Sequence, residues 1–99
     1  MINIDKYLNV NLEMQINGEV IYIKQPSAKI TREISEIEKD MTTDNYLEIK
    51  SKICLILLNN NSNNKIFTIE DLDNIPYKVQ DIIINKIIKM VVDADNDPN

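Results

Sequence analysis

Residues 10–25 read VNLEMQINGEVIYIKQ, and this stretch decides the fold class. Apolar and polar residues alternate on both sides of Asn17-Gly18, which is the period of a β-strand with one buried face. Asn-Gly between two such segments is the strongest short-range signal for a type I′ turn, because both turn positions need positive φ. The stretch therefore predicts an antiparallel β-hairpin.

The two-residue turn also fixes which residues of the hairpin lie opposite one another. Counting outward from the turn, the expected pairs are Ile16 with Glu19, Met14 with Ile21 and Leu12 with Ile23. The apolar members of these pairs share one face, which we expect the rest of the chain to cover. Val20 and Tyr22 lie on the other face, where they form a candidate surface for contact with a partner.

Helical patterns fill most of the remaining sequence, over residues 27–41, 45–59, 68–74 and 76–92. Ser27 and Thr68 stand at helix starts as N-caps, and Pro76 opens the last helix, where its missing N–H costs nothing. Residues 53–58 (ICLILL) are apolar all round, which is typical of a central helix, with a buried strand as the alternative. The expected architecture is α+β, with an N-terminal antiparallel β-hairpin packed against about four α-helices.

The 99 residues predict a single domain, made of the hairpin 10–25, a helical part 27–92 and an acidic, flexible tail 93–99. Residues 59–65 (NNNSNNK) have no apolar side chain to bury, so we expect a solvated, mobile loop. The aspartates of the tail imitate the start of a calcium loop, but Pro98 stands where such a loop requires glycine. We therefore expect no metal site there.

Several kinds of catalysis are excluded by residues that the chain lacks. It contains no histidine, a single glycine (Gly18) and a single cysteine (Cys54). Histidine acid–base catalysis, glycine-rich phosphate loops and cysteine clusters for zinc are therefore ruled out. Cys54 lies within an apolar run, so we expect it in the core rather than as a nucleophile. We predict a non-enzymatic protein without a cofactor.

The net charge of −5 disfavours binding to nucleic acid or to an anionic membrane, because both attract basic surfaces. The N-terminus has no signal-peptide core, and the most apolar run, residues 82–92, is too short to span a bilayer. We therefore expect a cytoplasmic protein whose partner is another protein.

The last predicted helix has an unusually wide apolar surface. One stripe contains Val79, Ile83, Ile87 and Met90, and the stripe beside it contains Tyr77, Ile84, Ile88 and Val91. In one interpretation both stripes face the core. In the other, Tyr77, Ile84 and Ile88 form a contact surface for a partner protein or for a second copy of the chain.

The order of these parts resembles the small tail assembly chaperones of long-tailed bacteriophages and prophages. The resemblance spans roughly residues 10–92 and rests on the hairpin closing at 23–26 (IKQP), on 57–61 (LLNNN), and on 67–72 (FTIEDL) followed by 75–79 (IPYKV). It implies a non-enzymatic protein that binds the tape measure protein or the tail tube protein during tail assembly in the host cytoplasm. It implies no particular site residue.

An alternative function comes from a different class, the small acidic inhibitors or immunity-type proteins that block a nucleic-acid enzyme. The carboxylates that would then supply the binding energy are Glu33, Glu36, Glu38 and Asp40. Salt distinguishes the two functions, because contacts between charges weaken as salt rises whereas apolar contacts do not.

Overall fold

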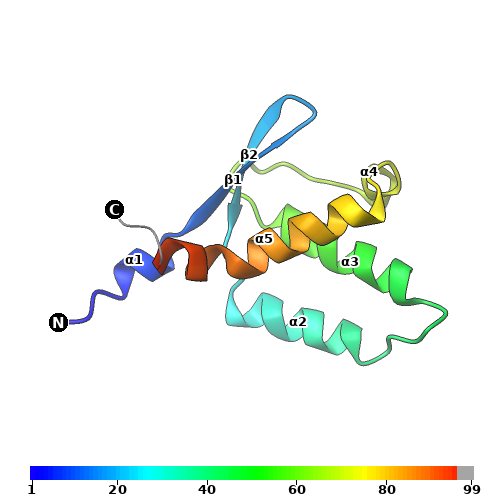
Figure 1. Ribbon diagram of the computed structural model, residues 1–99, viewed down its shortest axis with the longest axis horizontal. Coiled ribbons are helices and arrows are strands. Elements are labelled where there is room, and N and C mark those ends of the chain that lie inside the picture. The colour runs from blue at the N-terminus through cyan, green and yellow to red at the C-terminus, as the bar shows by residue number, and fades with distance from the viewer. Residues whose placement is uncertain (96–99) are drawn as a thin grey trace.

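A hairpin and several helices make up the computed structural model, which describes the backbone of residues 1–95 and the side chains of residues 1–90. In chain order the elements are α1 Asp5–Leu8, β1 Asn11–Ile16, β2 Glu19–Lys24, α2 Ala28–Glu38, α3 Tyr46–Asn59, α4 Ile69–Asp73 and α5 Tyr77–Asp95. Figure 1 shows the hairpin projecting from the helices, with α2 and α5 on either side of α3. The fold is α+β, as predicted.

The hairpin has the predicted register. The strands pair antiparallel, with Leu12 opposite Ile23, Met14 opposite Ile21 and Ile16 opposite Glu19. Asn17 and Gly18 have φ of 52° and 80°, which is the left-handed conformation that a type I′ turn needs at both positions. Ile21 and Ile23 are fully buried, and β2 contacts α3, so the helices cover the predicted inner face.

The asparagine-rich segment after α3 is exposed at Ser62, Asn63 and Asn64, as predicted, but it is anchored to the fold at Asn61, where the prediction of a solvated side chain is wrong. Asn61 is buried, and its side-chain amide donates to the carbonyls of Leu58 at 2.8 Å and Lys65 at 2.9 Å. Residues 60–63 run along the outer edge of β2, where Asn61 and Ile23 form an isolated antiparallel bridge. Asparagine carries both a donor and an acceptor, so such a run can be held by hydrogen bonds without burying apolar surface.

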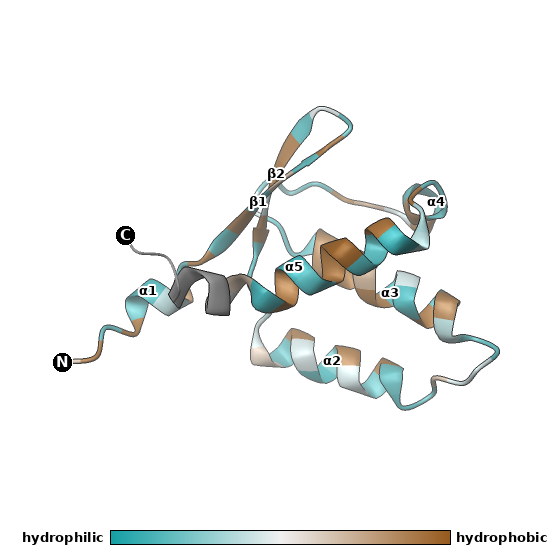
Figure 2. Ribbon diagram, in the orientation of Figure 1, coloured by the Kyte–Doolittle hydropathy of each residue, from teal (hydrophilic) through white to brown (hydrophobic). Residues whose placement is uncertain are grey.

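The helix α3 occupies the centre of the helical part, where it contacts α2, α4 and α5. Its apolar run is helical along its whole length, which excludes the buried-strand alternative. The core joins α3 to the hairpin and to one stripe of α5, and its buried members are Ile21, Ile23, Ile49, Ile53, Cys54, Leu57, Leu58, Phe67, Leu72, Ile83, Ile87 and Met90. Figure 2 shows the hydrophobic residues recurring along α3 and α5 and alternating along the strands.

Two helices begin at the predicted caps. The Ser27 hydroxyl accepts the Ile30 N–H at 3.2 Å, and Thr68 and Asp71 form a reciprocal capping box at the start of α4. The helix α2 ends at Glu38 rather than near residue 41, so about one turn of the predicted helix is a loop instead.

The two ends of the chain differ from the prediction. The sequence does not predict α1, a single turn without apolar periodicity that contacts α5. The helix α5 continues through Asp95, so the predicted tail begins inside the helix. The rest of that tail, residues 96–99, lies outside the described residues.

Candidate functional site

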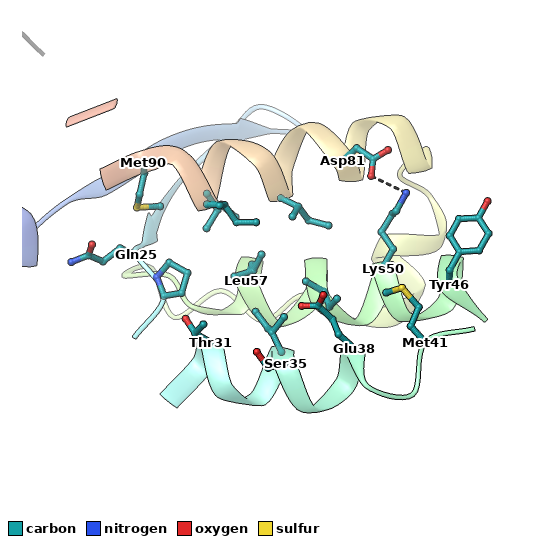
Figure 3. A pocket seen from close by; sticks show the side chains of 16 residues that line it. Gln25, Thr31, Ser35, Glu38, Met41, Tyr46, Lys50, Leu57, Asp81 and Met90 are labelled. Atoms are coloured by element: carbon teal, nitrogen blue, oxygen red, sulfur yellow. Dashed lines mark ion pairs between the residues drawn. The ribbon is translucent and has the colours of Figure 1, made fainter. Parts of the chain in front are cut away.

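A groove of about 580 Å³ opens between α2 and α5, with α3 as its floor (Figure 3). Both walls pack on α3 and make few contacts with each other, which leaves the space between them open. The apolar lining comes from three segments: Ile34 and Met41 on α2 and just after it, Ile53 and Leu57 on α3, and Ile84 and Ile88 on α5.

The helix α2 covers the core only partly. None of its residues is buried, although Ile30, Ile34 and Ile37 pack against core residues with part of their surface. One narrow apolar stripe gives α2 a single line of contact with α3, so its flank faces the groove. Ile88 is 63% exposed on the opposite wall, and Met41 is 40% exposed near the end of α2. Apolar surface is therefore left uncovered on both sides of the groove.

Polar groups stand at the rim of the groove. The Lys50 Nζ on α3 and an Asp81 carboxylate oxygen on α5 form an ion pair at 2.8 Å, which links the floor to one wall. Glu38 reaches the groove from α2, and no cation among the described residues pairs with its carboxylate. The rim thus presents an uncompensated negative charge beside the apolar lining.

Two of the predicted contact residues meet in this groove. Ile84 is partly buried against the core, Ile88 is exposed, and both line the groove. Tyr77 is exposed at the start of α5 but is not part of the lining. Val79, predicted for the core stripe, is 41% exposed, because it faces a second hollow beside the hairpin tip. The simple division of α5 into a core stripe and a contact stripe is therefore wrong at Val79.

Val20 and Tyr22 lie away from the groove, on the outer face of the hairpin, and both are exposed. The backbone of Tyr22 is fixed, because its N–H donates to Asn63 Oδ1 at 2.8 Å and its carbonyl accepts from the Ser62 N–H at 2.9 Å. The predicted contact residues therefore belong to two separate surfaces.

The sequence-based prediction misses the α2 side of the groove. Ile34 lies on the narrow apolar stripe of α2, Met41 lies in the loop after that helix, and Tyr46 is the first residue of α3. The narrow stripe could have indicated this wall of the groove, because a helix with a single apolar line packs along that line and leaves its flanks uncovered.

Cys54 is the only cysteine of the chain, and its side chain is fully buried. Burial raises the pKa of its thiol to about 12, and the negative charge of Asp81 adds to this shift. The thiol therefore keeps its proton near neutral pH and is a poor nucleophile. Among the described side chains, no group of His, Cys, Asp or Glu is placed to hold a metal ion.

Within the described part of the chain, no helix combines the length and the apolar character needed to cross a bilayer. Comparison with protein-family models, with curated proteins and with solved structures finds no match for this chain. The resemblance to tail assembly chaperones therefore stays a prediction, and the groove is the main structural guide to function.

Proposed function

We propose that this chain is a non-enzymatic tail assembly chaperone of a phage or prophage, which holds an apolar helical segment of the tape measure protein or the tail tube protein. The observation that supports binding is the uncovered apolar lining of the groove, with Ile88 and Met41 exposed on its two sides. The sequence resemblance supports the choice of partner and the place of action, the host cytoplasm.

A helix is the partner shape that the groove favours. The wall formed by α2 has 11 residues, which at about 1.5 Å per residue makes it about 16 Å long. About three turns of a partner helix fit along such a wall, with apolar residues at i, i+3, i+4 and i+7 facing the groove. These side chains would meet Ile34 on α2 and Ile84 and Ile88 on α5. The partner would then complete a helical layer that α2, α3 and α5 leave unfinished.

The negative charge at the rim of the groove favours apolar partner helices that also carry a basic residue. Glu38 has no cationic partner among the described residues, and the chain carries a net charge of −5. A lysine or arginine beside the apolar stripe of the partner would pair with Glu38. Such an exposed pair adds little affinity but orients the bound helix. Apolar contact supplies most of the affinity, so binding should depend only weakly on salt.

Two matched variants of α5 test the groove. Ile88 lines it, whereas Ile82 lies outside it and is similarly exposed, 57% against 63%. The proposed partner, a tape measure or tail tube protein, is titrated with each variant, and the dissociation constant is measured by calorimetry. We expect Ile88→Asp to weaken binding about 30-fold, the equivalent of about 2 kcal/mol for one buried isoleucine. Ile82→Asp should leave the dissociation constant within about twofold of wild type.

Two results would contradict the proposal. Equal effects of the two variants would show that the groove is not the contact surface. Failure of the wild-type chain to bind either proposed partner would reject the role in tail assembly.

The salt dependence of the same titration tests the alternative function. An acidic inhibitor would bind through Glu33, Glu36, Glu38 and Asp40, and its dissociation constant would rise steeply with salt. Glu36 is already paired with Lys39 at 2.8 Å, which reduces the negative charge that α2 presents. Weak salt dependence together with loss of binding in Ile88→Asp is the result that the groove predicts.

A further inference from the structure

The outer edge of β2 is closed by the chain itself. Three bonds join it to the asparagine-rich segment: Lys24 N–H to Asn60 O at 2.9 Å, Ser62 N–H to Tyr22 O at 2.9 Å, and Tyr22 N–H to Asn63 Oδ1 at 2.8 Å. The amides of Asn60 and Asn63 add bonds to carbonyls of β2. The segment therefore covers this edge in the way that a third strand would.

The outer edge of β1 is open. Three residues of β2, Val20, Tyr22 and Lys24, direct backbone groups to the asparagine-rich segment. Their partners on β1 are Gln15, Glu13 and Asn11. Residues that face each other in an antiparallel pair direct their backbone groups alike, either toward each other or both outward. The N–H and C=O groups of Asn11, Glu13 and Gln15 therefore point away from β2, and no described residue bonds to them. An open edge of 6 residues is a template for a further strand.

We propose that this strand is β1 of a second copy of the chain, paired antiparallel about a two-fold axis between the two Met14 residues. In this register, Glu13 of each copy stands opposite Gln15 of the other, so each carboxylate accepts a hydrogen bond from an amide. The outward backbone groups of the same residues form the ladder between the copies. The dimer contains a continuous sheet in the order β2, β1, β1, β2.

The side-chain pattern of β1 favours pairing with an identical strand, which is why we choose a second copy of the chain as the partner at this edge. The strand carries an exposed polar row and a half-buried apolar row, Leu12, Met14 and Ile16, and two-fold pairing brings each row against its own kind. A register that sets Glu13 opposite Glu13 would place two carboxylates together and is disfavoured. Pairing about Met14 avoids that repulsion.

The dimer contact is separate from the groove. No residue of β1 lines the groove, so the strand pairing uses none of the residues that line it. The inference therefore does not depend on the proposed function.

Sedimentation equilibrium of the full chain measures the association. Concentrations up to about 1 mM reveal dissociation constants as weak as the millimolar range, and we expect a dimer within this range. Gln15→Glu places a carboxylate opposite Glu13 on both sides of the axis and should raise the dissociation constant about tenfold or more. Asn85→Asp makes the same change of charge on the exposed face of α5 and should have no effect. Circular dichroism checks that each variant is folded.

A charge swap tests the register. Glu13→Lys combined with Gln15→Glu makes lysine face glutamate between the copies and should restore association to at least the wild-type level. A monomer at every concentration would overturn the proposal. A dimer that Gln15→Glu leaves intact, or a double variant as weak as Gln15→Glu alone, would also overturn it.

Discussion

Replacing Gln80 with methionine should destabilise the fold by about 2–4 kcal/mol, because a buried hydrogen-bond network would be broken. Gln80 is only 1% exposed. Its Oε1 accepts from Ser51 Oγ at 2.8 Å, and its Nε2 donates to the carbonyls of Leu72 at 3.0 Å and Ile75 at 2.9 Å. These bonds join the α5 wall of the groove to α3, to α4 and to the turn after α4.

The magnitude follows from the groups left without partners. The Leu72 carbonyl also accepts from the Ile75 N–H at 3.0 Å, so losing Gln80 costs it little. The buried Ser51 Oγ loses its hydrogen bond to Gln80 at about 1–3 kcal/mol, and the part-buried Ile75 carbonyl loses its own at about 1 kcal/mol, the low end of that range. Methionine has nearly the length of glutamine, so the cavity term is small.

Urea unfolding followed by circular dichroism measures this loss. We expect the midpoint of Gln80→Met to fall by about 2 M, since unfolding free energies of small domains change by about 1–3 kcal/mol per molar urea. Ser51→Ala and the double variant complete a mutant cycle. The double variant should cost less than the sum of the single variants, because it leaves neither side chain unpaired. Additive effects, or a loss below about 0.5 kcal/mol for Gln80→Met, would refute the reasoning.

Three further predictions concern single residues. Asn61→Ala should cost about 2–4 kcal/mol in urea unfolding, because its side chain bonds the buried Leu58 carbonyl and the part-buried backbone of Lys65. Asn85→Ala, on the exposed face of α5, should be nearly neutral. Gly18→Ala should cost about 1–2 kcal/mol through its φ of 80° alone, since no atom lies within 4 Å of an added Cβ, and Gly18→Asn should cost less because asparagine tolerates positive φ. The pKa of Cys54 rises on folding from 9.0 to about 12. Between pH 9 and pH 12 the folded state therefore keeps a proton that the unfolded state releases. The free energy of unfolding should fall in this range by up to about 1.4 kcal/mol per pH unit. Cys54→Ala should lack that component of the pH dependence, and a wild-type slope equal to that of the variant would contradict the burial of the thiol.

Local signals in the sequence predict the hairpin and two of the helix caps correctly. Asn17-Gly18 fixes the turn and with it the whole register, because a two-residue loop leaves no freedom in strand pairing. Ser27 and Thr68 cap their helices for equally local reasons, since each side chain bonds an N–H three residues away. Such interactions join residues that are close in the sequence, so they can be predicted without knowing the tertiary structure.

Features that depend on distant contacts are not predicted. Asn61 is buried only because the segment after α3 lies along β2, far away in the sequence. Likewise, the periodicity of α2 and α5 shows which residues are apolar but not how far apart the two helices stand on α3. The groove results from that separation, so the sequence indicates Ile84 and Ile88 as contact residues but not the opposing Ile34 and Met41.

Isoleucine methyl spectra offer the most direct test of the groove as a binding site, because isoleucines line it and also lie elsewhere on the surface. The labelled chain is titrated with the partner proposed above, a tape measure or tail tube protein. The methyl signals of Ile34, Ile84 and Ile88 should shift or broaden most, while those of Ile66 and Ile82, exposed outside the groove, stay in place. Changes centred on Ile66 or Ile82, with the groove signals unmoved, would contradict the account.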